Sequence, residues 1–145
     1  MECSHPDWEV LFHLYHDRKM NPMSFLKSEQ FLNILTESCL EKYPYIAFAD
    51  AFHTMRSMLL PVLYLLGSEV PLADTYHAIS TGYGGLLACL GGYVYRRPVL
   101  LTEHGIYTRE REEEIIRAKW VIPSFKKQWI SFFYMLSEAI YKRAF

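Results

Sequence analysis

Apolar side chains recur every three or four residues through the first 67 positions, the spacing that places them on one face of a helix. The three stripes predict helices over residues 8–15, 31–39 and 48–66. The expected ends of these three helices are Asn21-Pro22, Tyr43-Pro44 and Gly67. Pro61 is expected to kink or locally break the third helix, because proline lacks the amide proton and crowds the preceding turn.

The pattern changes after Pro71, where β-branched and aromatic residues form short runs. These runs predict a strand over 74–79, a turn at 80–82, a helix over 83–95 and a strand over 99–102. A strand, a crossover helix and a second strand form a βαβ unit, so we expect parallel strands with a right-handed crossover. Leu86, Leu87 and Leu90 are expected to face inward. Two parallel strands make a small sheet, which indicates either an unusual small α/β domain or part of a larger one.

The remaining residues predict two more helices. Thr108 is expected to cap a charged helix over residues 109–119. A helix that starts at Pro123 carries an apolar stripe of Phe125, Trp129, Phe132, Phe133, Leu136 and Ile140. We expect this stripe to be core. Because basic pairs at 126–127 and 142–143 flank it, a membrane-surface or partner-docking face is the alternative.

The composition is that of one folded domain. Of 145 residues, 51% are hydrophobic and 21% are charged, so a sizeable core can form. Lys and Arg number 15 against 16 Asp and Glu, which argues against a nucleic-acid binder that relies on broad phosphate neutralisation. Cys3, Cys39 and Cys89 lie far apart without C-x-x-C pairing, so we expect a reducing cytoplasm and no disulfide framework.

Neither a signal peptide nor a membrane span is expected. The opening residues MECSHPD lack a basic start and an apolar run. Residues 75–95 carry no charge and are long enough to span a bilayer. However, His77, Ser80, Thr81 and several glycines interrupt them, which favours an interior segment of a folded domain.

Two segments carry most of the polar chemistry, and each follows a predicted strand. They read HAISTGYGG at 77–85 and LTEHGIYTRER at 101–111. In open α/β sheets, ligands bind at the carboxyl ends of the strands. The turn at 80–84 opens a helix whose free amides suit a phosphate or a sugar hydroxyl, although its glycines also allow close packing on the strand. Leu87 stands where a dinucleotide fingerprint needs its third glycine, and no Walker loop is present.

His77 and His104 are the candidate polar actors, because an imidazole donates hydrogen bonds, acts as a base or stabilises nearby charge. A core histidine is the alternative for either residue. Glu103 is expected on the opposite face of the strand from His104. It is placed to orient a loop or to pair with Arg109 or Arg111.

Two further charged clusters have both a structural and a functional interpretation. The run at 109–114 is typical of a solvated helix face, while Arg109 or Arg111 is placed to hold an anionic or polyhydroxyl ligand. His13 and His16, together with Asp17, have the spacing of a helical metal site, but no second pair of ligands accompanies them.

The chain resembles the PelF-type glycosyltransferases of Pel exopolysaccharide synthesis. The resemblance is carried by ADTYHAISTGYGGLL at 73–87 and LLTEHGIYTRER at 100–111, and it extends from Trp8 to the YKRA ending at 141–144. It implies an α/β fold, a helix-rich fragment of the Rossmann-like amino-terminal domain of a retaining two-domain GT-B enzyme related to the family-4 glycosyltransferases. Residues 1–145 would then form a single, partial domain with a small parallel sheet.

The resemblance also implies UDP-glucose as donor, a glycan acceptor, no metal requirement, and a cytoplasmic location beside inner-membrane Pel proteins. In such enzymes the amino-terminal domain shapes the acceptor side, and the carboxyl-terminal domain holds most of the nucleotide sugar and a paired-glutamate motif. The opening strand and the donor domain are expected to lie outside these residues. We therefore expect the isolated chain to be inactive and to self-associate through an exposed sheet edge.

The resemblance assigns a catalytic role to His104, which would face the transferred sugar. It assigns substrate binding to His77, Ser80, Thr81, Gly82, Tyr83, Gly84, Glu103, Gly105, Tyr107 and Arg109. No metal ligand is carried over. Gly84 stands where relatives usually have alanine, which loosens the start of the helix.

Three functions remain open at this stage. The first is the acceptor-side domain of a UDP-glucose-dependent glycosyltransferase. The second is a non-catalytic docking module that retains the motif. The third is an unrelated small α/β protein that binds an anion at the helix start after Gly82.

Overall fold

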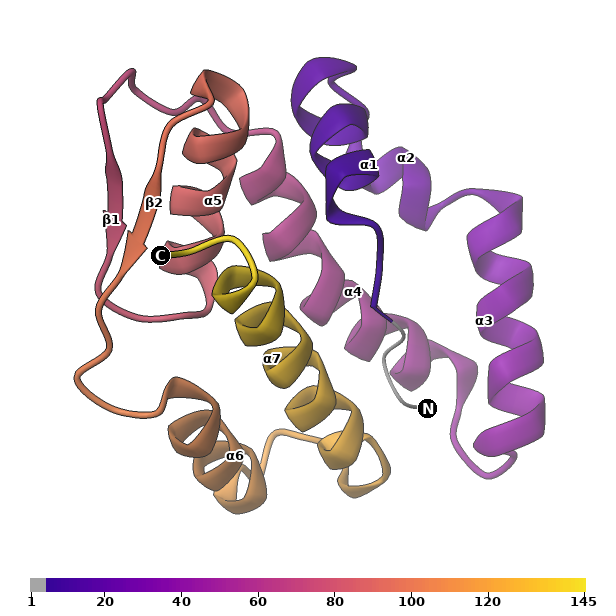
Figure 1. Ribbon diagram of the computed structural model, residues 1–145. Helices are drawn as coiled ribbons and strands as arrows, with labels where there is room; N and C mark the ends of the chain where they lie inside the picture. The colour runs from indigo at the N-terminus through magenta and orange to yellow at the C-terminus, as the bar shows by residue number, and fades with distance from the viewer. Residues whose placement is uncertain (1–4) are drawn as a thin grey trace.

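The structure is a computed structural model that describes residues 5–145 (Figure 1). Its elements, in chain order, are α1 (Trp8–Phe12), the π-helical turn η1 (His13–Asp17), α2 (Pro22–Leu26), α3 (Glu29–Lys42), α4 (Phe48–Leu66), β1 (Tyr76–Ala78), α5 (Tyr83–Tyr95), β2 (Val99–Leu101), α6 (Tyr107–Arg117), the 3₁₀ turn η2 (Pro123–Phe125) and α7 (Lys126–Tyr141). Most of the described chain is thus helical, around one strand–helix–strand unit.

The two short strands lie side by side at one end of the molecule (Figure 1). They pair in parallel, with Tyr76 opposite Val99 and Ala78 opposite Leu101. The predicted βαβ unit is confirmed, with strands shorter than expected. The side chains of these four residues alternate with exposed ones, so one face of the sheet packs on α5 and the other is open to solvent. The fold is a helix-rich α/β arrangement with a small parallel sheet.

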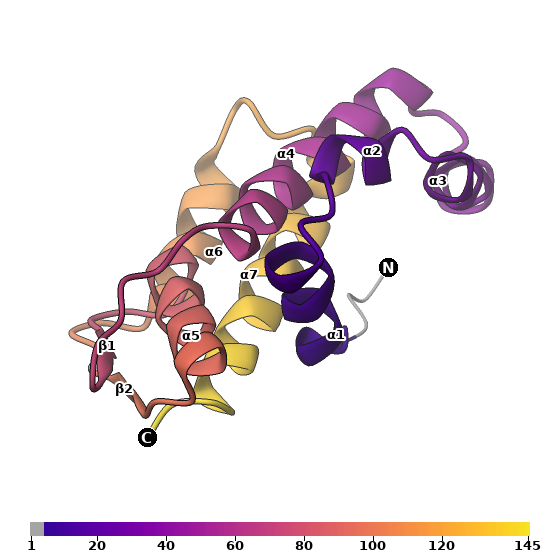
Figure 2. The same cartoon turned by 90° about the horizontal axis from the view of Figure 1, so that it is seen from above.

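The helices pack around α5 and α7. Helix α5 contacts the sheet, α4 and α7, while α6 lies against α7. Helix α3 contacts α2 and α4 and lies at the edge of the molecule farthest from the sheet (Figure 2). The sheet and its crossover helix therefore form one end of the fold, and α3 forms the other.

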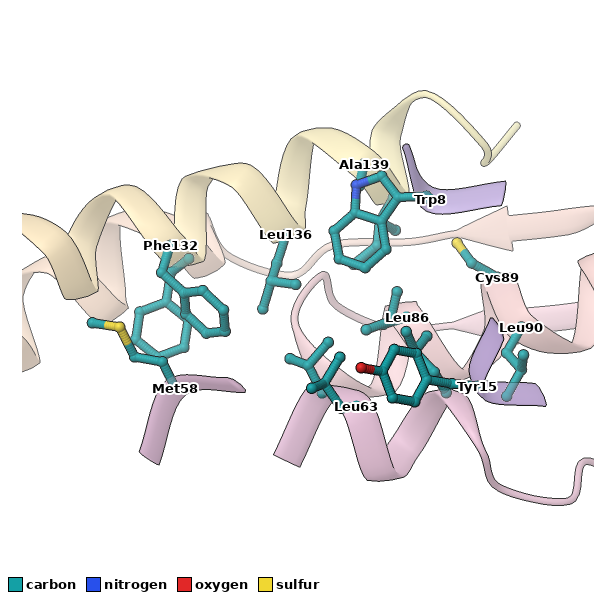
Figure 3. Close-up of a cluster of buried hydrophobic side chains, with 14 of the residues drawn as sticks. Trp8, Tyr15, Met58, Leu63, Leu86, Cys89, Leu90, Phe132, Leu136 and Ala139 are labelled. Carbon is teal, nitrogen blue, oxygen red and sulfur yellow. The ribbon is translucent and has the colours of Figure 1, made fainter. Parts of the chain in front are cut away.

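The core lies where α1, α4, α5 and α7 meet (Figure 3). Leu86, Leu90, Leu136 and Ile140 are at most 1% exposed. Burying each such side chain contributes about 2 kcal/mol, so this meeting of four helices dominates the stability. The predicted apolar stripe of α7 is confirmed as core, and its alternative as an exposed docking face is wrong because its residues are buried.

Capping residues explain where the early helices begin. The Asp7 carboxylate accepts the backbone N–H groups of Glu9 and Val10, and Ser28 Oγ accepts that of Phe31. Asn21 was expected to follow the end of a helix, and it also starts α2, because its side chain caps the helix and Pro22 occupies the first helical position.

Three local expectations are wrong. The expected break at Pro61 is absent: helix α4 runs from Phe48 to Leu66 with Pro61 exposed on its surface. Thr108 is not a cap: Ile106 precedes α6, and Thr108 is the second helical residue, 7% exposed. Leu87 is 38% exposed and does not face inward with Leu86 and Leu90.

No helix within residues 5–145 is long and apolar enough to cross a membrane, as expected for residues 75–95. Cys39 and Cys89 are buried free thiols, and burial raises the pKa of Cys89 to about 11, which makes it an unreactive thiol. Cys3, and most of the opening segment MECSHPD, lie outside the described residues.

Candidate functional site

The carboxyl ends of β1 and β2 open into a hollow of about 320 Å³. Its walls come from the residues after β1, the loop after β2 and the first turns of α6. The residues that line this sheet-edge hollow are Ile79, Ser80, His104, Gly105, Tyr107 and Glu110. All but Ile79 and Glu110 were predicted as site residues. The hollow lies where ligands bind in open α/β sheets.

The carboxylate of Glu103 holds the loop after β2 in place. Its Oε1 accepts hydrogen bonds from Thr81 Oγ1 at 3.1 Å and from the Thr81 backbone N–H at 3.4 Å. Its Oε2 accepts one from Tyr141, and burial together with this carboxylate raises the pKa of the Tyr141 hydroxyl to about 12. Thr81 is 1% exposed and accepts a further hydrogen bond from Ser137 Oγ at 2.8 Å.

This network gives Glu103 and Thr81 a positioning role behind the hollow. Within the described residues Glu103 forms no ion pair with an arginine, so the expected pairing is wrong, while the expected role in orienting a loop is supported. Because the network joins the loop after β2 to the turn after β1 and to α7, it fixes the loop that carries His104.

The aromatic ring of Tyr107 covers Gly82. The φ angle of Gly82 is +86°, a conformation that glycine adopts without strain, and a Cβ atom there would lie 2.5 Å from Tyr107 Cζ. The same ring lies edge-on to Phe133, 6.1 Å between centres, and 5.1 Å from the Arg111 guanidinium. Burial raises the pKa of the Tyr107 hydroxyl. Gly82 therefore serves the close packing of this turn against α6.

Other predicted site residues lie outside the lining of the hollow. His77 is exposed in the middle of β1, and its Nε2 is hydrogen-bonded to Thr102 Oγ1 at 3.0 Å. Tyr83 and Gly84 form the first turn of α5, where Tyr83 is half-buried and its pKa is raised by burial, while Gly84 is exposed. No hydrogen bond joins His77 to His104 within residues 5–145.

The charge of the hollow suits a neutral, hydroxyl-rich ligand. Among the described residues, none that lines it is Lys or Arg. Arg109 is exposed outside the lining, and Arg111 pairs with Glu114 at 2.5 Å. The exposed His104 imidazole, the hydroxyls of Ser80 and Tyr107, and the Glu110 carboxylate supply both donors and acceptors.

Glu110 is the polar lining residue that sequence reasoning missed. It lies three residues after Tyr107 on α6, so the two side chains share a helix face. A Cβ atom on Gly105 would lie 2.6 Å from Glu110 Oε1, which shows how closely the carboxylate approaches the loop. The three-residue spacing between Tyr107 and Glu110 was the sequence signal that could have identified Glu110. The run of charges at 109–114 obscured it.

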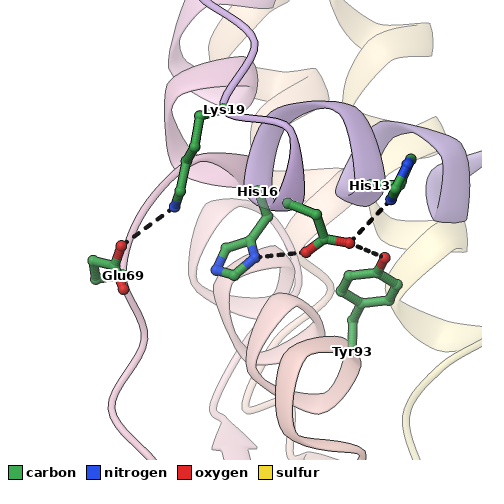
Figure 4. A network of polar contacts seen from close by, with 6 residues as sticks. His13, His16, Lys19, Glu69 and Tyr93 are labelled. Atoms are coloured by element: carbon green, nitrogen blue, oxygen red, sulfur yellow. Dashed lines mark hydrogen bonds and ion pairs between the residues drawn. The ribbon is translucent and has the colours of Figure 1, made fainter.

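Asp17, which does not line the sheet-edge hollow, accepts hydrogen bonds from the side chains of His13, His16 and Tyr93 (Figure 4). Its Oδ2 lies 2.8 Å from the donating Tyr93 hydroxyl and 3.1 Å from His13 Nδ1, and its Oδ1 lies 3.0 Å from His16 Nδ1. Among the described residues no group of three His, Cys, Asp or Glu side chains is placed to hold a metal. This cluster links η1 to α5 instead.

We expect Asp17→Asn to destabilise the protein in a pH-dependent way. Hydrogen bonds from His16 and Tyr93, with a weaker contribution from His13, lower the pKa of Asp17 from 3.8 to about 2. A lowered carboxyl pKa stabilises the fold above pH 3.8, and that contribution is lost as the pH falls towards 2. The melting temperature of the variant should therefore lie below the parent's at pH 6 and approach it near pH 2.

The matched control for this variant is Asp74→Asn, which removes an exposed carboxylate that has no ion pair among the described residues. Thermal melts followed by circular dichroism from pH 2 to pH 7 measure both variants. A gap between Asp17→Asn and the parent that is the same at every pH would contradict the role of the Asp17 charge.

No curated protein and no solved structure matches this chain. One protein family does match, over residues 3–145, nearly the whole chain. The protein therefore belongs to the family described as a domain of unknown function, DUF3492.

Proposed function

We propose that this chain forms the acceptor side of a retaining, UDP-glucose-dependent glycosyltransferase of exopolysaccharide synthesis. The DUF3492 family is associated with glycosyltransferases, which supports the general class. The more specific PelF-type assignment rests on the segments at 73–87 and 100–111. Both segments contribute to the sheet-edge hollow, through Ser80 and His104 among others.

The observation that carries the proposal is the character of that hollow. It places an exposed imidazole among hydroxyl and carboxylate groups at the carboxyl edge of a parallel sheet. Sugar hydroxyls both donate and accept hydrogen bonds, and such a mixed set recognises them. Glu110 would repel a diphosphate, so the hollow suits an acceptor glycan and the transferred sugar better than the nucleotide.

His104 has the catalytic role in this proposal. Retaining transfer develops positive charge on the sugar ring while the diphosphate leaves, so a polar group beside that ring acts through position and electrostatics. His104 is exposed at the hollow, and the Glu103 network fixes its loop. Glu103 and Thr81 act through this loop as positioning residues.

The location and partners follow from the same resemblance. We propose a cytoplasmic protein peripheral to the inner membrane that works beside Pel-type synthesis proteins, with a nucleotide sugar and a glycan as substrates and no metal cofactor. These proposals on location, substrates and partners go further than the glycosyltransferase class itself.

The charge of the hollow leads to a binding prediction for this chain. UDP-glucose should bind the 145-residue chain with a Kd of about 1 mM or weaker, which corresponds to about 4 kcal/mol. Calorimetry with UDP-glucose, and with inorganic diphosphate as control, measures it. Micromolar binding of either would instead support an anion site at the start of α5.

Catalysis is tested in a chimera in which residues 8–145 replace the matching segment of a PelF-type glycosyltransferase. We expect this chimera to transfer glucose from UDP-glucose to acceptor. A folded chimera without transfer, with the parent enzyme active in the same assay, would contradict the proposed function.

The open face of the sheet favours the docking module as the second candidate. His77, Ile79 and Leu100 alternate with the buried strand residues, and Ile79 is 67% exposed while Leu100 is 41% exposed. Among the described residues, no strand pairs with the outer edge of β1. Parallel sheets are usually covered on both faces, so this side suits another chain or a second copy. Light scattering on the purified chain tests for self-association.

A further inference from the structure

A second pocket lies between α4, α7 and the segment that connects α6 to η2. Its volume is about 200 Å³. The residues that define this indole pocket are Asp50, His53, Thr54, Ser57, Trp120 and Trp129. None of them contributes to the sheet-edge hollow.

Trp120 is an exposed indole held in a fixed position. It is 68% exposed, whereas Trp8 and Trp129 are each 6% exposed. Its ring meets that of Trp129 nearly at right angles, with centres 5.5 Å apart. Such an edge-to-face pair restrains the exposed ring, because Trp129 is itself packed against Phe132 and Phe133. The pocket thus has one flat apolar wall that is largely in contact with water.

The opposite wall is a row of polar side chains on one face of α4. Asp50, His53, Thr54 and Ser57 follow the three- and four-residue spacing of a helix face. The Thr54 and Ser57 hydroxyls donate to the carbonyls of Asp50 and His53, both at 2.8 Å, so their oxygens are left as acceptors. The Asp50 carboxylate and the His53 imidazole form no ion pair among the described residues. This wall therefore offers both donors and acceptors to a ligand.

We propose that the indole pocket binds one sugar ring of a neutral saccharide, stacked on Trp120 and hydrogen-bonded to the polar row of α4. A pyranose has an apolar C–H face and a rim of hydroxyls, which matches one aromatic wall and one wall of mixed donors and acceptors. A phosphate-bearing ligand fits poorly, because Asp50 is anionic and, within the described chain, no Lys or Arg lines the pocket.

The surface between the two sites points to an extended saccharide. A shallow hollow along α6 shares Glu110 with the sheet-edge hollow and Trp120 with the indole pocket. The 11 residues of α6 span about 16 Å, a length that a short oligosaccharide covers. The role of such an oligosaccharide as the acceptor rests on the proposed function, whereas its stacking on Trp120 does not.

Calorimetry and tryptophan fluorescence on the 145-residue chain test this proposal with three neutral probes, cellohexaose, chitohexaose and β-1,4-galactohexaose. At least one probe should bind saturably and shift the emission, since Trp120 is the exposed indole of the three. Trp120→Ala should weaken that binding about tenfold or more, and Trp120→Phe, the matched control that retains an aromatic ring, should stay within about threefold. Circular dichroism checks that both variants fold.

Three results would overturn the proposal: no binding of any probe, equal binding by Trp120→Ala, or a shift caused by tetramethylammonium alone, which would indicate a cation site. Binding of these probes is measured on the 145-residue chain without glucose transfer, so this test is independent of the chimera that tests the proposed function. Saccharide binding at Trp120 together with an inactive, folded chimera would reject the glycosyltransferase assignment alone.

Discussion

Gly82→Val is expected to destabilise the fold by about 3 kcal/mol or more. A β-branched residue at a φ of +86° is strained, and its Cβ would collide with the Tyr107 ring at 2.5 Å. That ring cannot simply rotate away, because it packs against Phe133 and Arg111. For a chain of this size, the melting temperature should fall by about 10 °C in a thermal melt followed by circular dichroism.

Gly84→Ala is the matched control, two residues along the same helix start. Gly84 has no positive φ, and no atom lies within 4 Å of a Cβ built on it. Alanine should therefore leave the melting temperature unchanged or raise it slightly, because it reduces the freedom of the unfolded chain. A stable Gly82→Val variant, or a Gly84→Ala variant as damaged as Gly82→Val, would show that the Tyr107 packing does not constrain this turn.

The elements with strong local signals were predictable from the sequence. Helix α5 starts at Tyr83 and ends at Tyr95, as the glycine turn before it and the Arg-Arg-Pro break after it indicate. The parallel pairing of β1 and β2 followed from the strand–helix–strand order. These features depend on residues close in sequence, so spacing alone carries the information.

Interactions between distant residues were not predictable in the same way. The partners of Glu103 are Thr81, 22 positions away, and Tyr141, 38 positions away, and no sequence pattern links them. The sequence indicated arginines on the next helix because they were near in the chain. The packing of α7 against α5 and α6 brings Tyr141 to the carboxylate instead.

The candidate site was predicted in part for the same reason. The rule that ligands bind at the carboxyl ends of parallel strands located Ser80 and His104 correctly at the sheet-edge hollow. The same rule selected Thr81, but this residue lies behind the hollow. The burial of Thr81 depends on Ser137 of α7, which is far away in the sequence. The indole pocket was not anticipated, since Trp120 and the α4 row meet only in the folded chain.

His104→Ala should lower glucose transfer by the chimera about 10²-fold or more, the scale of one lost polar contact to the transition state. The loss should appear mainly in kcat, because the interaction is strongest when charge develops on the sugar ring. His104→Gln, which keeps a hydrogen-bond donor, should recover part of the rate. His13→Ala, which removes an exposed imidazole of η1, is the matched control and should stay within about threefold of the parent.

Initial rates at saturating UDP-glucose, with circular dichroism to confirm folding, distinguish catalysis from positioning. Glu103→Gln should release the loop and raise the KM for the acceptor as well as lower kcat, since the amide leaves one acceptor oxygen where Thr81 and Tyr141 each donate to their own. His104→Ala should instead leave KM nearly unchanged. A folded His104→Ala chimera that transfers glucose within threefold of its parent would remove His104 from the mechanism and leave the hollow as an acceptor-binding surface alone.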